Sequence, residues 1–233
     1  MKAFLLAAGL GTRLRPLTDT IPKCMVPIQG RSLLDIWLDS LAGAGVDEVL
    51  VNLHHRADVV RGHLAGRSAP PIVRTVYEEE LLGSAGTMAA NKDWVDGEDL
   101  VLACNADNLT DFDLRSLVAA HQATGAIATL TLFHAERPAE CGIVEVDRSG
   151  RMIAFREKPS TPASDLANAG MYVFHPCIID EITGPPPKDI GYDVLPSLVG
   201  RAHTITVDSY FRDIGTPEAL QRAQQEWPRV GRR

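Results

Sequence analysis

The feature that most constrains the fold is a regular alternation of short apolar runs with amphipathic segments in the first half of the chain. Residues 2–7 and the stretches "EVLVNL", "IVRTVYE" and "DLVLAC" are predicted strands, and segments with helical spacing separate them. Nearly continuous apolar strands that alternate with helices indicate a parallel sheet covered on both faces. The sequence therefore predicts an α/β protein with a Rossmann-like, mixed but mainly parallel sheet flanked by helices.

The second half has a different pattern. It predicts strands at "IATLTLFH" and "NAGMYVFHP", a hairpin that turns at "DRSG", and two short strands within "HTITVDSYFRDIG". A helix over residues 111–125 is predicted to begin at the N-cap Asp111 and to stop at Gly125, and a closing helix has Thr216 as its N-cap. No linker or internal repeat separates the two halves, so we expect one domain over residues 1–233.

Composition excludes several classes of protein. The formal net charge of -7 argues against a nucleic-acid-binding protein, which relies on a basic surface. The four cysteines form no CxxC pair, which favours reduced thiols over disulfides or a zinc site. The first apolar run is too short for a signal sequence or a membrane span, so we expect a cytoplasmic protein without membrane contact.

The loop after the first strand, "GLGTRLRPLT", is the strongest candidate for a ligand site. Gly9 and Gly11 let a ligand approach the backbone amides, and Arg13 and Arg15 add positive charge suited to phosphate oxygens. A Walker A loop is excluded because no GK[ST] occurs, and a dinucleotide fingerprint fails because Leu14 stands where its third glycine belongs. The stretch "CNADN" follows the fourth strand and is predicted at the same edge of the sheet.

The string "GLGTRLRPLT" followed by "PKCMVP" resembles the signature of the sugar-1-phosphate nucleotidyltransferases, also called nucleoside-diphosphate-sugar pyrophosphorylases. The resemblance covers nearly the whole chain and continues in "YEEELLGSAGTM", "CNADN", "FREKP" and "FRDIGTPEAL". It implies the nucleotide-diphospho-sugar transferase fold, with a nucleotide-binding part over about residues 1–125 and a sugar-phosphate-binding part over about residues 126–233. The chain ends soon after the closing helix, so we expect no carboxyl-terminal β-helix. One departure is Cys24, where the family commonly has proline.

The resemblance implies a reaction in which a nucleoside triphosphate and a sugar 1-phosphate give a nucleoside-diphosphate sugar and pyrophosphate. It assigns catalytic roles to Arg13 and Lys23, and Mg²⁺ to Asp107 and Asp213. The nucleotide-binding residues that it implies are Leu6, Ala8, Gly9, Gly11, Thr12, Arg13, Leu82, Gly83, Ser84, Gly86, Asn105 and Asp107. The sugar-phosphate-binding residues that it implies are Asn108, Gly142, Glu157, Lys158, Asn168 and Gly170.

Within the family, "PKCMVP", "LLGSAGT", "ADN" and "LANAGMY" look most like bacterial guanylyltransferases that act on mannose 1-phosphate or a heptose 1-phosphate. Thymidylyl and uridylyl transfer stay open. A phosphocholine cytidylyltransferase is a further alternative, but only 6% of residues are aromatic, whereas a quaternary ammonium requires aromatic side chains. A homodimer is left open.

Three other features receive structural interpretations. The stretch "KDIGYD" repeats Asp-Ile-Gly but lacks the Thr-Pro-Glu of "DIGTPE", so we assign it to structure. His54 and His55 are adjacent on a strand and face opposite ways, so they are not expected to share a metal ion. Cys104 has no evident triad partner and is not expected to act as a nucleophile.

Overall fold

The computed structural model describes residues 1–230, with side chains described up to residue 227. The chain forms two compact units. Unit 1 contains residues 1–81, 104–114 and 209 onward, and unit 2 contains residues 82–103 and 115–208. The family resemblance implied two consecutive parts that meet near residue 125, and this division differs from them. The chain enters unit 2 twice, returns to unit 1 each time, and ends in unit 1.

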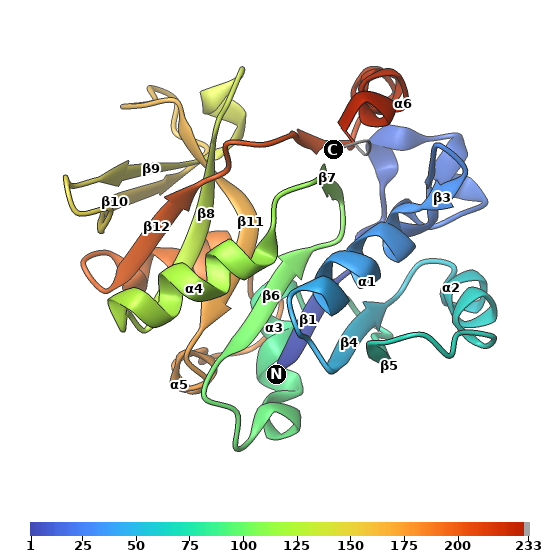
Figure 1. Cartoon of the computed structure of the whole chain (residues 1–233), viewed down its shortest axis with the longest axis horizontal. Coiled ribbons are helices and arrows are strands. Elements are labelled where there is room, and N and C mark those ends of the chain that lie inside the picture. Colours follow the sequence, from blue (N-terminus) through green and yellow to red (C-terminus); the bar gives the residue numbers. More distant parts are fainter. Residues whose placement is uncertain (231–233) are drawn as a thin grey trace. The chain divides into compact units, whose positions relative to one another are not determined.

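Unit 1 is built on parallel strands joined by helices (Figure 1). Strand β4 (Glu48–Leu53) pairs in parallel with β1 (Lys2–Leu6) on one side and with β5 (Ile72–Tyr77) on the other. The connections contain α1 (Leu33–Gly43) and α2 (Ala57–Leu64). Helix α1 begins where Ser32 accepts a hydrogen bond from the Asp35 amide, 3.0 Å away, and it buries Leu34, Trp37, Leu38 and Leu41. These βαβ units confirm the predicted parallel arrangement.

Short antiparallel pairs complete unit 1. Strand β2 (Pro27–Ile28) pairs with β3 (Arg31–Ser32), and β7 (Asn108–Thr110) pairs with β13 (Phe211–Asp213). Helix α6 (Pro217–Val230) follows, and the Ala219 amide donates to the Thr216 hydroxyl at 3.2 Å, which confirms the predicted N-cap. The β7–β13 register pairs Asp213 with Asn108 and thereby brings the late part of the chain beside Asp107.

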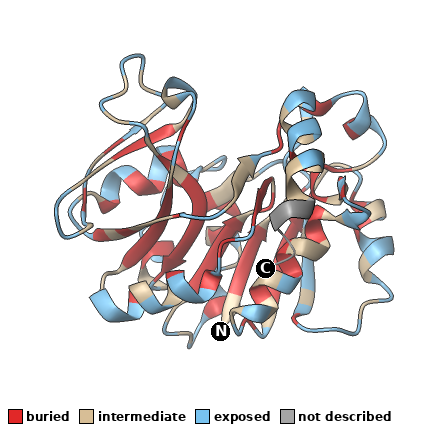
Figure 2. Cartoon of the chain, turned by 45° about the horizontal axis from the view of Figure 1, so that its top comes forward, coloured by how far each residue is buried: buried red, intermediate tan, exposed pale blue. Residues whose placement is uncertain are grey.

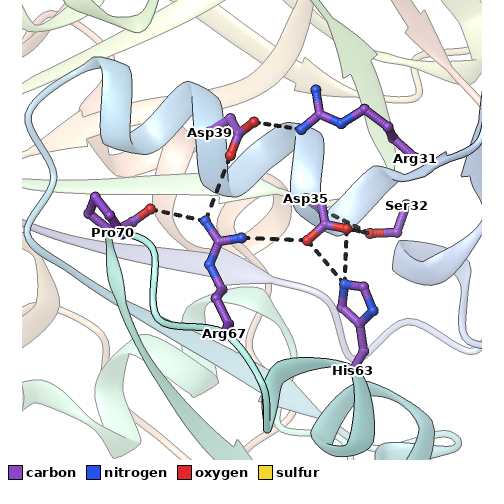
Figure 3. A network of polar contacts seen from close by, with 7 residues as sticks. All are labelled: Arg31, Ser32, Asp35, Asp39, His63, Arg67 and Pro70. Atoms are coloured by element: carbon purple, nitrogen blue, oxygen red, sulfur yellow. Dashed lines mark hydrogen bonds and ion pairs between the residues drawn. The ribbon is translucent and has the colours of Figure 1, made fainter.

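A polar cluster fastens α1 to α2 and to the segment between α2 and β5 (Figure 3). Asp35 on α1 lies 2.9 Å from Nε2 of His63 and 3.6 Å from Nη1 of Arg67. Arg67 also reaches Asp39, and it donates to the carbonyl of Pro70 at 2.9 Å. Burial opposes ionisation of Asp35, but hydrogen bonds from His63 and Ser32 and the charge of Arg67 hold the pKa of its carboxyl below the ordinary value.

Unit 2 is built mainly on antiparallel strands (Figure 1). Strand β11 (Leu166–Phe174) lies antiparallel to β8 (Ala128–His134) and to β9 (Gly142–Val146), and β12 (Ala202–Thr206) runs parallel to β8. Strands β9 and β10 (Met152–Glu157) form the predicted hairpin, whose turn is closed by the Ser149 amide donating to Asp147. The helices are α3 (Ser84–Ala90), α4 (Leu114–Thr124) and α5 (Cys177–Asp180). The chain passes from unit 2 back into unit 1 within β6 (Val101–Asn105).

The prediction that Asp111 caps the helix was wrong. Helix α4 begins at Leu114, three residues later, and Asp111 instead accepts a hydrogen bond from the Tyr210 amide at 2.8 Å. The carboxylate therefore anchors the residue before β13. At the other end, Gly125 follows the last residue of α4 with a positive φ of 60°, as its predicted role as a stop requires.

Buried residues are concentrated on the strands of each unit, while the outer faces of the helices are exposed (Figure 2). In unit 1 the core includes Phe4, Leu5, Val49 and Val51, and in unit 2 it includes Leu130, Val144, Met171 and Phe174. No helix in residues 1–230 combines the length and the apolar character that a bilayer crossing requires.

Candidate functional site

The glycine loop of unit 1 keeps its backbone amides accessible. Nothing lies within 4 Å of the position of a Cβ at Gly9, and Gly11 has a φ of 61°, which L-residues with side chains rarely adopt. A Cβ at Gly11 would lie 2.9 Å from the methyl carbon of Thr18. The hydroxyl of this buried threonine donates to the Gly11 carbonyl at 2.8 Å. Thr18 therefore fixes the loop in a conformation that leaves its amides free for an anion.

The ammonium group of Lys23 joins two carboxylates from distant parts of the chain. Its Nζ lies 3.0 Å from Oδ2 of Asp107 and 3.0 Å from Oδ1 of Asp213. The Lys23 side chain is only 8% exposed, whereas those of Asp107 and Asp213 are 46% and 48% exposed. A buried lysine is held by two carboxylates that keep open faces toward solvent. The three residues that sequence analysis assigned to phosphate and metal binding are thus in direct contact.

Arg13 lies beside one of these carboxylates, that of Asp213. Its Nη2 lies 3.5 Å from Oδ2 of Asp213. A Cβ at Gly215 would lie 2.6 Å from that guanidinium nitrogen, so a side chain at this position would displace Arg13. The Gly215 amide also donates to Oδ1 of Asp213 at 2.7 Å. The "DIG" turn therefore holds the Asp213 carboxylate and leaves room for the arginine.

Arg15 is engaged differently. Its Nε lies 3.2 Å from the Asp19 carboxylate, and both side chains are exposed. The carboxylate of Asp19 therefore balances the positive charge of Arg15 close by in the sequence. Arg13 is thus the arginine of this loop that is directed to the paired carboxylates.

Sequence analysis missed a buried polar pair next to the first strand. Asn52 Oδ1 accepts a hydrogen bond from the Ala7 amide at 2.6 Å, and its amide group donates to Glu78 at 2.9 Å. Both side chains are buried, and buried polar groups at such a position fix the backbone that they contact. The available signal was a lone asparagine inside the apolar strand "EVLVNL".

The other predicted residues of unit 1 lie on the elements around this site. Leu6 ends β1, and its carbonyl accepts the Ala106 amide at 3.0 Å, next to Asp107. Ala8 is buried, while Thr12 is exposed at the start of a 3₁₀ turn. Asn105 ends β6, and Asn108 is buried, with its carbonyl accepting a hydrogen bond from the Trp37 indole at 2.8 Å.

The residues of this site fit a magnesium ion. Among the described residues no group of three histidines, cysteines or acidic side chains could hold a metal. Mg²⁺ does not require one, because it commonly binds one or two carboxylates and completes its shell with water and phosphate oxygens. Asp107 and Asp213 both approach one ammonium nitrogen within 3.0 Å and provide oxygen donors. The donor set therefore matches magnesium.

In unit 2, the predicted base-reading segment Leu82, Gly83, Ser84 and Gly86 is held by the main chain of Lys188. The Lys188 amide donates to the Leu82 carbonyl at 2.8 Å, and its carbonyl accepts the amides of Ala85 and Gly86 at 2.9 and 3.1 Å. A Cβ at Gly83 would lie 2.2 Å from that carbonyl oxygen, and Gly83 has a φ of 78°. Only glycine fits at this turn into α3.

Glu157 and Lys158 follow one another at the end of β10. The Glu157 side chain is only 17% exposed, and its Oε2 lies 2.5 Å from the position of a Cβ at Gly142, so the glycine leaves space for it. Burial raises the pKa of the Glu157 carboxyl; Lys158 opposes this shift and Asp189 adds to it. Lys158 is exposed, with a positive φ of 45°, an unusual backbone conformation that its amide supports by donating to Cys141 at 3.0 Å.

Asn168 and Gly170 lie in an irregular part of β11. The Asn168 side chain donates to the Tyr172 hydroxyl at 2.6 Å and accepts the Gly170 amide at 3.1 Å. The register with β8 shifts between Asn168 and Tyr172, so the strand bulges here. The asparagine is thus oriented by its own strand.

Two structural interpretations from the sequence agree with the geometry. Burial raises the pKa of the Cys104 thiol to about 12, which makes it a poor nucleophile at neutral pH. His54 and His55 contact different carbonyls, those of Glu78 and Thr18, at 2.8 and 2.7 Å.

Cys24, the departure from the family pattern, is buried beside Lys23, and burial raises the pKa of its thiol to about 12.

Comparison with known proteins decides the family. The family model described as "Nucleotidyl transferase" matches residues 2–229. The chain belongs to the nucleotidyl transferase family. This confirms the expectation from "GLGTRLRPLT" and "PKCMVP", and the match spans both units of this nucleotidyl transferase.

Individual relatives carry different names. The chain is 34% identical to the mannose-1-phosphate guanylyltransferase of Mycobacterium tuberculosis over 96% of its own length and 64% of that protein. It is 33% identical to a UTP–glucose-1-phosphate uridylyltransferase of Synechocystis over 92% of its own length and 60% of that protein. It thus spans about three fifths of these curated relatives. The crystal structure of HddC from Yersinia pseudotuberculosis matches with a TM-score of 0.82 at 23% identity, over 97% of this chain and 99% of that one, and shows the same fold.

Proposed function

We propose that this nucleotidyl transferase joins a nucleoside triphosphate to a sugar 1-phosphate, with release of pyrophosphate. One observation carries the proposal: Lys23, Asp107 and Asp213 come together within 3.0 Å, beside Arg13 and an open glycine loop. Cationic side chains next to exposed carboxylates suit a polyphosphate and its metal ion. These four side chains include no histidine base and no serine or cysteine nucleophile. Phosphoryl chemistry needs such charge neutralisation and alignment above all.

The triphosphate is assigned to unit 1. The amides of the loop between Gly9 and Gly11 bind phosphate oxygens, and Arg13 adds a fixed positive charge. Lys23 contributes a second cation where negative charge is most crowded. Because Thr18 and Gly215 hold the loop and the arginine in position, these donors are aligned before the substrate arrives.

Asp107 and Asp213 are assigned to Mg²⁺. When bound, the ion supplies neutralising charge to the phosphate oxygens of the triphosphate. The two carboxylates are half-exposed, so they can bind an ion that also keeps water and phosphate ligands.

The acceptor is assigned to unit 2. Lys158 presents an exposed ammonium group for the phosphate of the sugar 1-phosphate, and Glu157 accepts hydrogen bonds from sugar hydroxyls. The acceptor phosphate is already ionised at neutral pH, so its oxygen attacks the α-phosphorus of the triphosphate without a general base. A new P–O bond forms in line as the bond to the leaving pyrophosphate breaks.

GTP with mannose 1-phosphate or a heptose 1-phosphate is our favoured substrate pair. The named guanylyltransferase relative supports it, together with the resemblance of "PKCMVP" and "LANAGMY". The uridylyltransferase relative at nearly equal identity favours UTP with glucose 1-phosphate as the second candidate.

The experiment is a measurement of pyrophosphate release over a panel of four ribonucleoside triphosphates and dTTP against several sugar 1-phosphates and phosphocholine. We expect release with one triphosphate and a sugar 1-phosphate in the presence of Mg²⁺, and none after chelation. Asp107→Asn should lower turnover by two or more decades, about 3 kcal/mol of barrier. Asp96→Asn is the matched control, because Asp96 is exposed and lies outside the site. Release with phosphocholine alone, or normal turnover of Asp107→Asn, would refute the proposal.

A further inference from the structure

The segment over residues 188–193, "KDIGYD", contacts both predicted binding regions of unit 2. Its first residue, Lys188, holds the turn before α3 through three main-chain hydrogen bonds. Sequence analysis assigned this segment to structure because it lacks the residues that follow "DIG" in "DIGTPE". Its side chains and its glycine make further contacts of a more specific kind.

Asp189 links this segment to Ser84, the first residue of α3. The Ser84 hydroxyl donates to Oδ2 of Asp189 at 2.9 Å and accepts the Ile190 amide at 2.8 Å. The other carboxylate oxygen, Oδ1, accepts the Gly191 amide at 2.8 Å. One aspartate therefore shapes its own turn and fixes the position of the serine.

Gly191 lies against the Glu157 carboxylate. A Cβ at Gly191 would lie 2.8 Å from Oε2 of Glu157, and one at Gly142 would lie 2.5 Å from the same oxygen. The carboxylate thus occupies a slot between two glycine backbones, and a methyl group at either position would displace it. The slot fixes where Glu157 can accept a hydrogen bond.

We propose that Asp189 and Gly191 are positioning residues for the two substrates: Asp189 sets the base-reading turn through Ser84, and Gly191 sets the carboxylate of Glu157. This inference rests on the proposed function for the identity of the substrates. Both residues act through others. Gly191 should therefore affect acceptor binding and spare the triphosphate, whereas Asp189 should affect triphosphate binding most and acceptor binding less, through the Gly191 amide that it holds.

The first test compares Asp189→Ala with Asp189→Asn. Asp189→Ala removes both acceptors, and we expect the KM for the preferred triphosphate to rise about tenfold and discrimination among bases to fall. The acceptor KM should rise less, because the Gly191 amide loses its hydrogen-bond acceptor. Asp189→Asn keeps an acceptor for Gly191 and a polar partner for Ser84, so it should restore the triphosphate KM to within about threefold of wild type.

The second test uses Gly191→Ala, whose methyl group displaces the Glu157 carboxylate. We expect the acceptor KM to rise about tenfold and the triphosphate KM to stay within about twofold. Tyr192→Ala is the matched control in the same turn, since that side chain is 60% exposed; both KM values should stay at wild type. A rise in the triphosphate KM of Gly191→Ala, or no rise in its acceptor KM, overturns the proposal, as does an unchanged triphosphate KM in Asp189→Ala.

Hydrogen exchange provides a readout that does not depend on turnover. In Asp189→Ala the amides of Ala85 and Gly86 should exchange at least about tenfold faster than in wild type, while in Tyr192→Ala they should be unchanged. If wild type releases no pyrophosphate with any pair of substrates, the proposed function fails. The positioning role is then tested by hydrogen exchange and by the triphosphate affinity measured by calorimetry. Unchanged exchange in Asp189→Ala overturns it.

Discussion

Lys23 contacts the same oxygens that we assign to the metal ion. The family resemblance implied a catalytic role for this lysine, and its contact with Asp107 and Asp213 was not predicted. Without a metal, the ammonium group balances two carboxylates that would otherwise repel each other. An ion that binds these oxygens must therefore compete with Lys23, and the lysine then becomes available to phosphate.

Lys23→Met should slow turnover and tighten metal binding. Turnover should fall by two or more decades, because a cation that aligns the triphosphate is lost. Mn²⁺ serves as a paramagnetic substitute for Mg²⁺, and its Kd can be measured by electron paramagnetic resonance. This Kd should fall by about tenfold, since the competing ammonium group is gone. Asp107→Asn should bind Mn²⁺ more weakly in the same titration. Weaker Mn²⁺ binding by Lys23→Met would contradict this competition.

Glu157 should give acceptor binding a distinct pH dependence. Its ionised form accepts hydrogen bonds from sugar hydroxyls, and burial raises the pKa of its carboxyl, with Lys158 opposing and Asp189 reinforcing the shift. As the pH falls, the acceptor KM should therefore rise at a pH above about 4.3, the ordinary glutamate value. The triphosphate KM should not follow the same curve. In Glu157→Gln the acceptor KM should be high and should lose this transition.

At the scale of elements, the polar cluster of Asp35, His63 and Arg67 holds α1 against the segment that leads to β5. Arg67 is mostly buried, with 16% of its side chain exposed, and contacts two aspartates of α1 and a carbonyl. Arg67→Met should lower the free energy of unfolding by about 1–2 kcal/mol, measured by urea denaturation. Arg74→Met removes an exposed ion pair with Glu48 and should cost about 0.5 kcal/mol or less.

The same cluster predicts a change of stability with pH. The folded-state pKa of Asp35 is lowered, so its contribution is present above the ordinary aspartate value of about 3.9 and is lost as the pH falls through the lower folded value. Stability curves of wild type and Asp35→Asn should therefore converge as the pH falls below about 4. Parallel curves over that range would show that Asp35 makes no such contribution.

The elements that sequence predicted well are those with a strong local signal. The apolar runs of β1, β4 and β5 follow from residue periodicity, and the cap at Thr216 follows from a threonine directly before a proline. The misplaced cap at Asp111 shows the limit, because a carboxylate before a helix can equally bind a distant amide, here that of Tyr210. The role of the segment after Lys188 was missed for a related reason: its contacts with Ser84 join residues about 100 positions apart.

At the scale of the whole molecule, unit 1 is assembled from three separate stretches of chain. The last stretch supplies β13, which pairs with β7, and Asp213, which pairs with Lys23. The family resemblance implied that Asp107 and Asp213 share a site, but the strand pairing that joins them is only three residues long and could not be seen from periodicity. The division into units was likewise not predicted, because it depends on contacts between distant segments.

A fragment of residues 1–208 should reveal this dependence. It lacks β13 and α6, so β7 loses its partner and Lys23 keeps only Asp107. We expect loss of Mn²⁺ binding and a broad thermal transition in place of a cooperative one. Addition of a peptide spanning residues 209–230 should restore both in part. Cooperative unfolding of the fragment with normal Mn²⁺ affinity would contradict the proposed role of the last stretch.

The β7–β13 pairing also has a consequence for synthesis in the cell. A ribosome delivers the chain from its amino end, so the glycine loop and Lys23 emerge long before the aspartate at position 213. A nascent or prematurely terminated chain therefore contains the glycine loop and Lys23 but lacks Asp213. Under the proposed function, such a chain lacks one of the two carboxylates assigned to the metal ion, so it should not turn over substrate until residues 209 onward have been synthesised.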